Sequence, residues 1–600
     1  MGLRSSCVWP MSQAEPRAGR GLGRIMSRYL NDVVRMYLDE MIDWAPVLRM
    51  QKGEHVDVDA ERSALGEVLE TAAAICAEIE PAAREGWEQT SRLEDGQVIY
   101  PPHIQAGYDK LREAGLVAFG VREEYGGFGL PVFISNVILQ MISRADAGLM
   151  TIVGLQAGVA EDIQLYASDE LKERYLPLFA SGEVMGAMDL TEPEAGSDLG
   201  AIITRAADKD DHCLLTGNKI FITNGGCEVH LVLARDAESF EASKGTTRGL
   251  SLFLCPRTLP SGEPNRVRVT RLEHKLGIHG SPTAAIEFDE ATAWRVGEKG
   301  EGFKAMLSLM NNARLGVAAQ GVGICEAALD SAVRYARERK QFGQSIADQP
   351  LMKNMLSRMV IDQEGGRALL YRACILIDKN RAIEAVLARG GVGFEEQREL
   401  EEQRDRNDAR IRLLTPLAKY LATEACDEIT RKAIQIHGGL GFMAESEPGK
   451  LHNDGIITTI YEGTSEIQVS FALKEIGKGS LGVVFEEISK ELDSLEDPDL
   501  VEYAGKVRQG MARILEASAA LLADFGYALL SAQLLADVVI AVIVAAELLK
   551  QAQADPRRFD LAASWINRRM LDVEWKTQRI QDGDSARIDR CERIVALTED

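Results

Sequence analysis

The stretch Ile460-Tyr461-Glu462-Gly463-Thr464-Ser465-Glu466-Ile467-Gln468 sets one carboxylate between an apolar, β-branched run and a glycine. The run ahead of it, residues 456–460, can hold the Glu462 carboxylate away from water. Burial raises the pKa of a glutamate toward the range useful for proton abstraction, so Glu462 is the candidate base. Glu466 is expected to be more exposed to solvent than Glu462. The alternative interpretation of Glu462 is an acidic residue at a helix start, where the helix dipole favours negative charge.

Four further segments come before this stretch. They are Leu190–Asp198 (LTEPEAGSD), Gly217–Gly225 (GNKIFITNG), Arg339–Gly343 (RKQFG) and Gln435–Phe442 (QIHGGLGF). In this order, and followed by the Glu462 motif, they resemble the acyl-CoA dehydrogenase family over roughly residues 65 to 476. The two ends of the chain are similar to the longer subclass of that family, which has an N-terminal extension and an extra C-terminal helical domain.

The resemblance implies an α+β, mainly α fold. Helical periodicity before residue 184 and after Gly302, with short apolar runs between 214 and 288 that are typical of strands, agrees with that fold. We expect an N-terminal extension (1–60), an N-terminal helical domain (61–184), a middle β domain (185–298), a C-terminal helical bundle (299–478) and an extra C-terminal helical domain (479–600). The charged stretch 395–410 predicts a solvated helix face.

Composition excludes several classes of function. The formal charge of -24, from 92 acidic and 68 basic residues, argues against a nucleic-acid surface, which needs a basic footprint. The nine cysteines form no C-x-x-C pair, so no metal site and no disulfide framework is predicted. The aliphatic stretch Val538–Ala546 lies between Asp537 and Glu547 and is shorter than the roughly 20 residues of a membrane span. It predicts a buried helix and no transmembrane span.

The first 25 residues carry four arginines against a single Glu15, a balance typical of a transit peptide. Alternatively, translation starts at Met26, where acidic, helix-patterned sequence begins. We therefore expect a cytoplasmic protein of a bacterium, or a mitochondrial matrix protein if residues 1–25 are a transit peptide.

Dehydrogenation of an acyl thioester removes an α-proton and a β-hydride, and no side chain accepts a hydride. The resemblance implies FAD as the hydride acceptor. The residues alone do not identify a flavin, because no G-x-G-x-x-G follows a strand. Carried over by motif, Glu462 is the base, and its backbone amide joins a flavin ribityl hydroxyl in binding the thioester oxygen.

The resemblance also implies a set of cofactor-binding residues. Those expected to line the flavin are Met188, Leu190, Thr191, Ser197, Phe221 and Thr223. Phe221 departs from the tryptophan common there, keeping an aromatic wall without the indole donor. Those expected to reach the FAD of a neighbouring subunit are Arg339, Gln341, Phe342, Gln435, Gly438 and Gly439, while Thr464 and Glu466 match positions near the adenosine half. The alternatives are core packing for Met188 and Leu190, a helix-end cation for Arg339 and a connecting turn for Gly438 and Gly439.

Four positions are expected to contact the substrate. Arg314 matches a family arginine near the CoA moiety, and Asn311 stands where some members have aspartate. Ser197 and Gly463 belong to the flavin-lining and base motifs and are assigned to the substrate as well.

The resemblance thus implies an FAD-dependent flavoprotein of fatty acid metabolism. It would convert an acyl-CoA to a trans-2-enoyl-CoA and pass electrons to electron-transfer flavoprotein. The alternatives are an acyl-CoA oxidase that uses oxygen, and a catalytically silent flavin- or CoA-binding assembly factor. We expect a homodimer, because the extra C-terminal domain can cover the surface that a second dimer would occupy.

Overall fold

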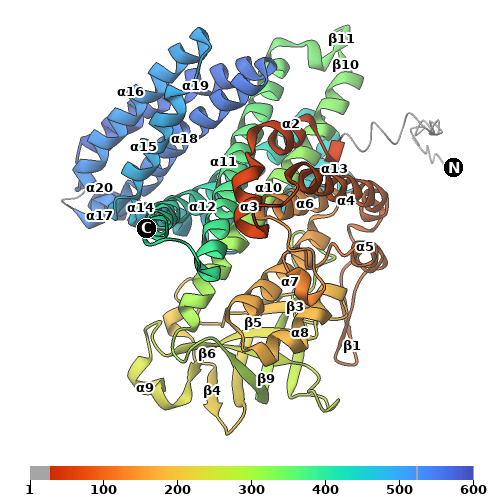
Figure 1. The fold of residues 1–600 in the computed structure, drawn as a ribbon. Coiled ribbons are helices and arrows are strands. Elements are labelled where there is room, and N and C mark those ends of the chain that lie inside the picture. Colours follow the sequence, from red (N-terminus) through yellow and green to blue (C-terminus); the bar gives the residue numbers. More distant parts are fainter. Residues whose placement is uncertain (1–27, 522–523, 599–600) are drawn as a thin grey trace, which may run out of the picture.

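The computed structural model describes residues 28–521 and 524–598 (Figure 1). Between residues 307 and 311 it describes the helix but not the side chains. The interpretation of residues 1–25 as a leader, and of Met26 as a start, therefore falls outside the described residues. The domain boundaries given above remain predictions.

The first helices that the structure describes lie at the centre right of Figure 1, and the last two of them lie lower, beside the sheet. They are α2 (Asp32–Met36), η1 (Tyr37–Met41), α3 (Trp44–Lys52), α4 (Val58–Gly86), α5 (Pro102–Glu113), α6 (Val132–Ala145), α7 (Ala147–Tyr166) and α8 (Asp169–Ser181). One residue, Asp146, separates α6 from α7, and its carboxylate caps α7 by accepting from the amides of Gly148 and Leu149. A small hairpin of β1 (Arg92–Glu94) and β2 (Gln97–Ile99) interrupts the predicted helical region.

The middle of the chain forms a sheet, at the bottom of Figure 1. Its strands are β3 (Gly186–Asp189), β4 (Arg205–Asp208), β5 (Cys213–Thr223), β6 (Val229–Asp236), β7 (Leu250–Pro256), β8 (Val267–Leu272) and β9 (Thr283–Val296). The strand order is β3-β6-β4-β5-β9-β7, with β8 on β9. Because β7 pairs with both β6 and β9, the sheet closes into a small barrel. The predicted apolar runs all lie in these strands.

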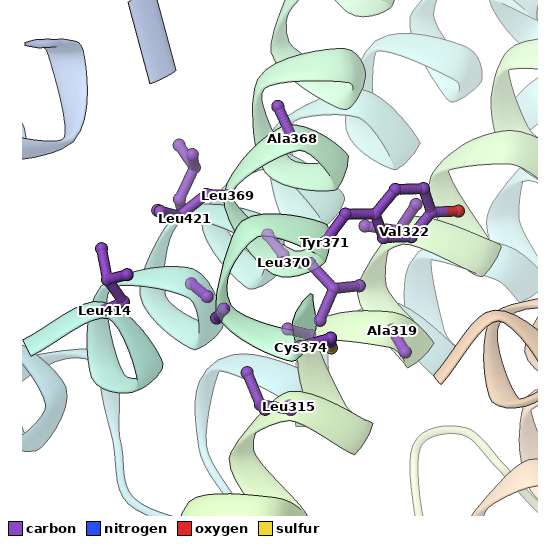
Figure 2. Packing of buried hydrophobic residues seen from close by; sticks show 14 of the residues in the cluster. Leu315, Ala319, Val322, Ala368, Leu369, Leu370, Tyr371, Cys374, Leu414 and Leu421 are labelled. Carbon is purple, nitrogen blue, oxygen red and sulfur yellow. The ribbon is translucent and has the colours of Figure 1, made fainter. Parts of the chain in front are cut away.

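Three long helices form the bundle: α10 (Gly302–Glu338), α11 (Pro350–Arg389) and α12 (Phe394–His437). Figure 2 shows apolar side chains from all three packed together, among them Leu315, Tyr371 and Leu421. The charged stretch 395–410 is the largely exposed first part of α12, which confirms a solvated helix face. The hairpin β10 (Lys340–Gln341) and β11 (Gln344–Ser345) joins α10 to α11. After α12 come η6 (Gly438–Phe442), α13 (Glu447–Ile456), η7 (Ile457–Thr459) and α14 (Ser465–Gly477).

A last helical unit lies against the bundle, at the upper left of Figure 1. It contains α15 (Ser480–Asp493), α16 (Pro498–Ala520), α17 (Phe525–Leu530), α18 (Ala532–Ala554), α19 (Phe559–Gln581) and α20 (Arg587–Ala596). Among the described residues, α18 alone is long and apolar enough to cross a membrane, with a mean hydropathy of 2.2 over its most apolar window. That window is 83% buried in protein, as in the core helix of a folded domain. The apolar helix is thus longer than the predicted Val538–Ala546, because Asp537 and Glu547 lie within it.

Buried ionic contacts join the two ends of the chain to the bundle. Arg372 of α11 donates to Glu491 of α15 (2.8 Å) and to Glu547 of α18 (3.0 Å). The hydroxyl of Tyr37, in η1, donates to the same Glu547 carboxylate over 2.8 Å. The N-terminal helices, the bundle and the last helical unit therefore share one core.

Candidate active site

A cavity of about 900 Å³ lies between the sheet and the helices α6, α7, α10 and α14. Its size is in the range typical of ligand and cofactor sites. Its lining is mainly apolar, with a small number of hydroxyl, amide and charged side chains. Glu462 lies on its wall.

The backbone at Glu462 is held in an unusual conformation. Glu462 has φ +55° and Gly463 has φ +92°, two consecutive residues in the left-handed region that L side chains rarely adopt. The Gln468 amide fixes this turn by donating to the carbonyl oxygens of Glu462 (2.9 Å) and Gly463 (3.0 Å). Thr464 then caps α14 by accepting from the Ile467 amide. The turn directs Glu462 to the cavity wall instead of starting the helix with it.

The electrostatics of Glu462 suit a base. Burial raises the pKa of its carboxyl, while the nearby Arg314 and Lys419 cations lower it and so favour the carboxylate. The side chain keeps some accessible surface because it faces the cavity, although protein surrounds it on the other sides. Glu466, by contrast, is exposed, as the sequence predicts. The structure therefore supports a proton acceptor at Glu462 better than a helix-start acid.

Two buried cations lie behind the base. Burial lowers the pKa of Lys419 to about 8 and that of Arg314 to about 10, and Glu462 opposes both shifts. Lys419 donates to the carbonyl oxygen of Gly463 over 2.7 Å, and the Arg314 guanidinium lies over the ring of Phe471, 4.6 Å from its centroid. None of the sequence motifs predicts Lys419. The available signal was a single lysine in the apolar run LLTPLAKYLA, since an unpaired lysine is almost never fully buried.

The residues predicted to line the flavin come together on the same cavity. Met188, Leu190, Thr191, Ser197, Phe221 and Thr223 all line the cavity. Phe221, at φ +59°, leaves 59% of its side chain accessible. A Cβ added to the neighbouring Gly196 would meet no described atom within 4 Å. An open cradle with aliphatic, aromatic and hydroxyl groups fits an isoalloxazine ring, which needs apolar faces and a few hydrogen bonds at its edge.

A buried ion pair positions this wall. The Lys219 ammonium donates to Glu192 (2.8 Å) and to the carbonyl oxygens of Leu190 (2.9 Å) and Leu233 (2.8 Å). Glu192 also accepts from the backbone amides of Ile203 (2.8 Å) and Thr204 (3.1 Å). Burial raises the pKa of Glu192, but Lys219 and these hydrogen bonds bring it below its usual value. The pair ties the Leu190–Thr191 segment to β5 and β6.

The residues predicted to reach a neighbouring subunit lie elsewhere. Arg339, Gln341, Phe342, Gln435, Gly438 and Gly439 are absent from the cavity wall that the described residues form. They gather beyond the far end of α10, where Tyr335 stacks on His437 with ring centroids 4.3 Å apart. From Val317, on the cavity wall, to Arg339 is about 30 Å along the helix. One chain therefore presents its two predicted cofactor-binding groups at separate places.

Of the remaining predicted positions, some lie on the cavity wall and others lie away from it. Gly463 and Thr464 line the cavity, whereas Glu466 does not lie on it. Arg314 lies behind the wall, beside Phe471. The side chain of Asn311 is outside the described residues; its neighbour Asn312 lines the cavity. In the part of the chain that the structure describes, no group of three or more His, Cys, Asp or Glu side chains could hold a metal ion.

Three family models match the chain. They are described as acyl-CoA dehydrogenase, N-terminal domain (residues 66–183), middle domain (187–291) and C-terminal domain (300–390 and 397–477). Together they cover most of α4, the helices α5 to α8, most of the sheet and the bundle with α13 and α14.

Individual proteins agree with these models. The chain is 34% identical over 454 residues to 3-methylmercaptopropionyl-CoA dehydrogenase of Ruegeria pomeroyi, covering 72% of this chain and 73% of the relative. It is 32% identical to the caffeyl-CoA reductase-Etf complex subunit CarC of Acetobacterium woodii, over 60% of this chain and 86% of that protein. The crystal structure of ACDH-11 of Caenorhabditis elegans in complex with C11-CoA has the same fold, with a TM-score of 0.74 at 21% identity over 94% of this chain and 95% of that one. The last helical unit is therefore part of a fold seen before.

Proposed function

The chain belongs to the acyl-CoA dehydrogenase family, and from that premise we propose that it converts an acyl-CoA thioester to a trans-2-enoyl-CoA with Glu462 as the base. It is an oxidoreductase that acts on acyl-CoA with FAD as its cofactor. The observation that carries the proposal is the position of Glu462, a carboxyl with a raised pKa on the wall of the cavity that the predicted flavin-lining residues also form.

In this proposal the side chains handle the proton and the developing charge. Glu462 accepts the α-proton, and its backbone amide donates to the thioester oxygen as enolate charge builds there. Lys419 and the Gln468 amide hold the turn, so that the carboxylate and the amide keep their relative positions. FAD, when bound, supplies the acceptor for the β-hydride. The apolar walls keep water away from the α-carbon.

The proposed electron acceptor is an electron-transfer flavoprotein. A relative that matches 60% of this chain bears a name that includes an Etf complex, which supports this choice. The alternative is an oxidase that returns electrons to oxygen. Stopped-flow reoxidation of the reduced protein by air or by electron-transfer flavoprotein decides between them, and rapid reoxidation by air alone would favour the oxidase.

The proposed assembly is a homodimer. The predicted neighbour-contacting group lies about 30 Å along α10 from the cavity, so a second subunit is needed for both groups to touch one FAD. At that end Phe342 is 94% exposed, and Leu440, Phe442 and Met443 are also exposed. An apolar patch of this kind is typical of a subunit interface.

The decisive experiment is anaerobic titration of the FAD-loaded protein with a broad panel of acyl-CoA esters. Bleaching of the flavin absorbance by at least one ester is expected. If none bleaches it, the dehydrogenase proposal is wrong and a catalytically silent flavin- or CoA-binding protein becomes the better interpretation.

A further inference from the structure

The cavity continues beyond Glu462 between α6 and α7. Val132, Ser135, Asn136 and Leu139 line it from α6, and Gly154, Ala157, Gly158 and Glu161 line it from α7. In both helices these residues are spaced i, i+3, i+4, i+7, which places each set on one helix face. The two faces therefore form facing walls along the length of both helices.

Gln320 fixes which end of these walls holds the base. The Tyr461 hydroxyl bonds to the Gln320 side chain, whose Nε2 donates to Ala147 O at the start of α7 (3.3 Å). Ser143, near the end of α6, donates to the Gln320 carbonyl over 2.9 Å. Asn136 is seven residues from Ser143, about 10 Å along α6, and Glu161 is about 20 Å along α7 from Ala147. The far end of the walls thus lies roughly 10 to 20 Å from the base.

Small residues leave this route open. A Cβ on Gly158 would meet no described atom within 4 Å, so that position faces free space. Gly154 and Ala157 lie on the same face of α7, and Gly316 lines the cavity from α10. A chain longer than a butyryl group can therefore pass along α7 toward the far end.

The far end is polar. The carboxylate of Glu161 and the guanidinium of Arg381, on α11, form an ion pair on the cavity wall. Asn136 is 6% exposed, and its Nδ2 donates to Val132 O over 2.9 Å. Its Oδ1 is buried and accepts no hydrogen bond from any described residue. Ser135 adds a hydroxyl beside it.

We propose that this end of the pocket binds a terminal hydroxyl, so that the substrate is a long-chain acyl-CoA hydroxylated near its ω end. This inference rests on the proposed function. A hydroxyl can donate to Asn136 Oδ1 while it accepts from Arg381 or Ser135, which satisfies the buried acceptor. A terminal methyl would remove water from the Glu161–Arg381 pair without replacing its hydrogen bonds. A terminal carboxylate would meet Arg381 with its charge already balanced by Glu161, so a second negative charge would be buried without a cation of its own.

Binding to the FAD-loaded Glu462→Gln protein tests the proposal without turnover. Isothermal titration would compare lauroyl-CoA, ω-hydroxylauroyl-CoA and dodecanedioyl-CoA, whose chains are long enough to reach the far end. We expect the hydroxylated ester to bind about 5- to 10-fold more tightly than lauroyl-CoA, as one satisfied hydrogen bond predicts. The dicarboxylic ester should bind most weakly.

Two variants and one control test whether the preference for the hydroxylated ester arises at the far end of the cavity. Asn136→Leu, of similar volume, should abolish the preference for the hydroxylated ester. The matched control is Asn380→Leu: Asn380 is likewise buried, with one amide hydrogen bond and an Oδ1 that accepts none from the described residues, but it lies off the cavity wall. It should leave the preference unchanged. Gly158→Leu, at a helical position with free space, should weaken both lauroyl esters relative to butyryl-CoA.

Equal or weaker binding of the hydroxylated ester, or a preference that survives Asn136→Leu, overturns the proposal. So does binding of butyryl-CoA without binding of either lauroyl ester. The proposed function is judged separately, by flavin bleaching of the wild-type protein with any acyl-CoA. Bleaching together with equal affinities would retain the dehydrogenase and reject the hydroxyl site.

Discussion

Lys419 and Gly463 lie 44 residues apart and are joined by one hydrogen bond, in which the buried ammonium donates to the carbonyl oxygen over 2.7 Å. The Lys419 side chain is completely buried, and its charge also lowers the pKa of the adjacent Glu462. A single side chain therefore does two things at once. It holds the turn that directs the base, and it favours the ionised form of that base.

Lys419→Met should move the acid limb of the rate to higher pH. Only the ionised carboxylate accepts the α-proton. The rate of flavin bleaching is therefore high at pH values above the pKa of Glu462 and falls at pH values below it. Without the ammonium the pKa of Glu462 rises further, because the opposing burial effect remains. The pH profile of anaerobic flavin bleaching measures this shift. Lys432→Met, on the same helix and paired with Glu428 away from the cavity, is the control that should not change the profile.

Glu462→Gln should leave a folded, yellow protein with turnover reduced about 10²- to 10⁴-fold, the usual loss when a general base is removed. The amide keeps the shape of the side chain but cannot accept the proton. Single-turnover bleaching, with FAD content and circular dichroism as checks on folding, measures the loss. Near-normal turnover of a folded, FAD-loaded variant would rule out Glu462 as the base.

Glu192→Gln should loosen the flavin wall. It leaves the buried Lys219 without its carboxylate, and breaking such a pair costs about 3–5 kcal/mol. Unfolding in urea should show this loss, together with weaker FAD retention. The double variant Glu192→Gln/Lys219→Met should recover part of the stability, because the uncompensated charge is gone. An additive loss in the double variant would contradict a direct coupling of the two residues.

Arg339→Ala should weaken FAD retention more than it slows the chemistry. An arginine fork can bond two oxygens of a pyrophosphate, and in the proposed dimer this one reaches the FAD of the partner. Fluorimetric titration of the apoprotein with FAD measures the affinity. Arg337→Ala, two residues earlier and also exposed, is the matched control. Unchanged FAD affinity in the Arg339 variant would show that the arginine is an ordinary helix-end cation.

Light scattering after size exclusion should find the full-length protein as a dimer. Truncation after Lys478 should make it insoluble, because the apolar surface of the bundle that the last helical unit covers is then exposed to water, and Arg372 loses both carboxylate partners. Truncation after Gln581 removes only α20 and the short segments on either side of it. Because α20 buries no residue, this variant should stay soluble. A full-length tetramer would refute the covering role of the last helical unit.

The motifs allowed the fold class and the flavin-lining wall to be predicted, because they carry local chemistry that the sequence displays. Leu190 and Ser197 belong to one motif and Phe221 to the next, and the structure places all three on one cavity. The assignment of these residues to FAD, and of Arg339 or Gly438 to a partner's cofactor, remains a prediction.

What the sequence did not reveal depends on packing between distant segments. Lys419 stands out only as a lysine in an apolar run, and its partner, the Gly463 carbonyl in the turn before α14, lies 44 residues away. The full length of α18 was hidden because Glu547 interrupts the apolar run. Arg372 and Tyr37, from distant segments, bond to this buried carboxylate, and Lys550 of the same helix pairs with it as well. The polar end of the cavity is formed by side chains of three helices, α6, α7 and α11, so no local sequence pattern connects Asn136 with Arg381.

The contact between Tyr37 and Glu547 spans 510 residues. When Tyr37 has been added to the nascent chain, residues 38–600 remain to be synthesised. The Tyr37 hydroxyl therefore cannot bond to Glu547 until synthesis is nearly complete. The surface of η1 around this hydroxyl therefore stays uncovered until α18 is made, although the Tyr37 ring can pack against Phe133 and Tyr371 before then. We expect a nascent chain stalled before α18 to bind chaperones through η1, and to release them only once α18 has left the exit tunnel.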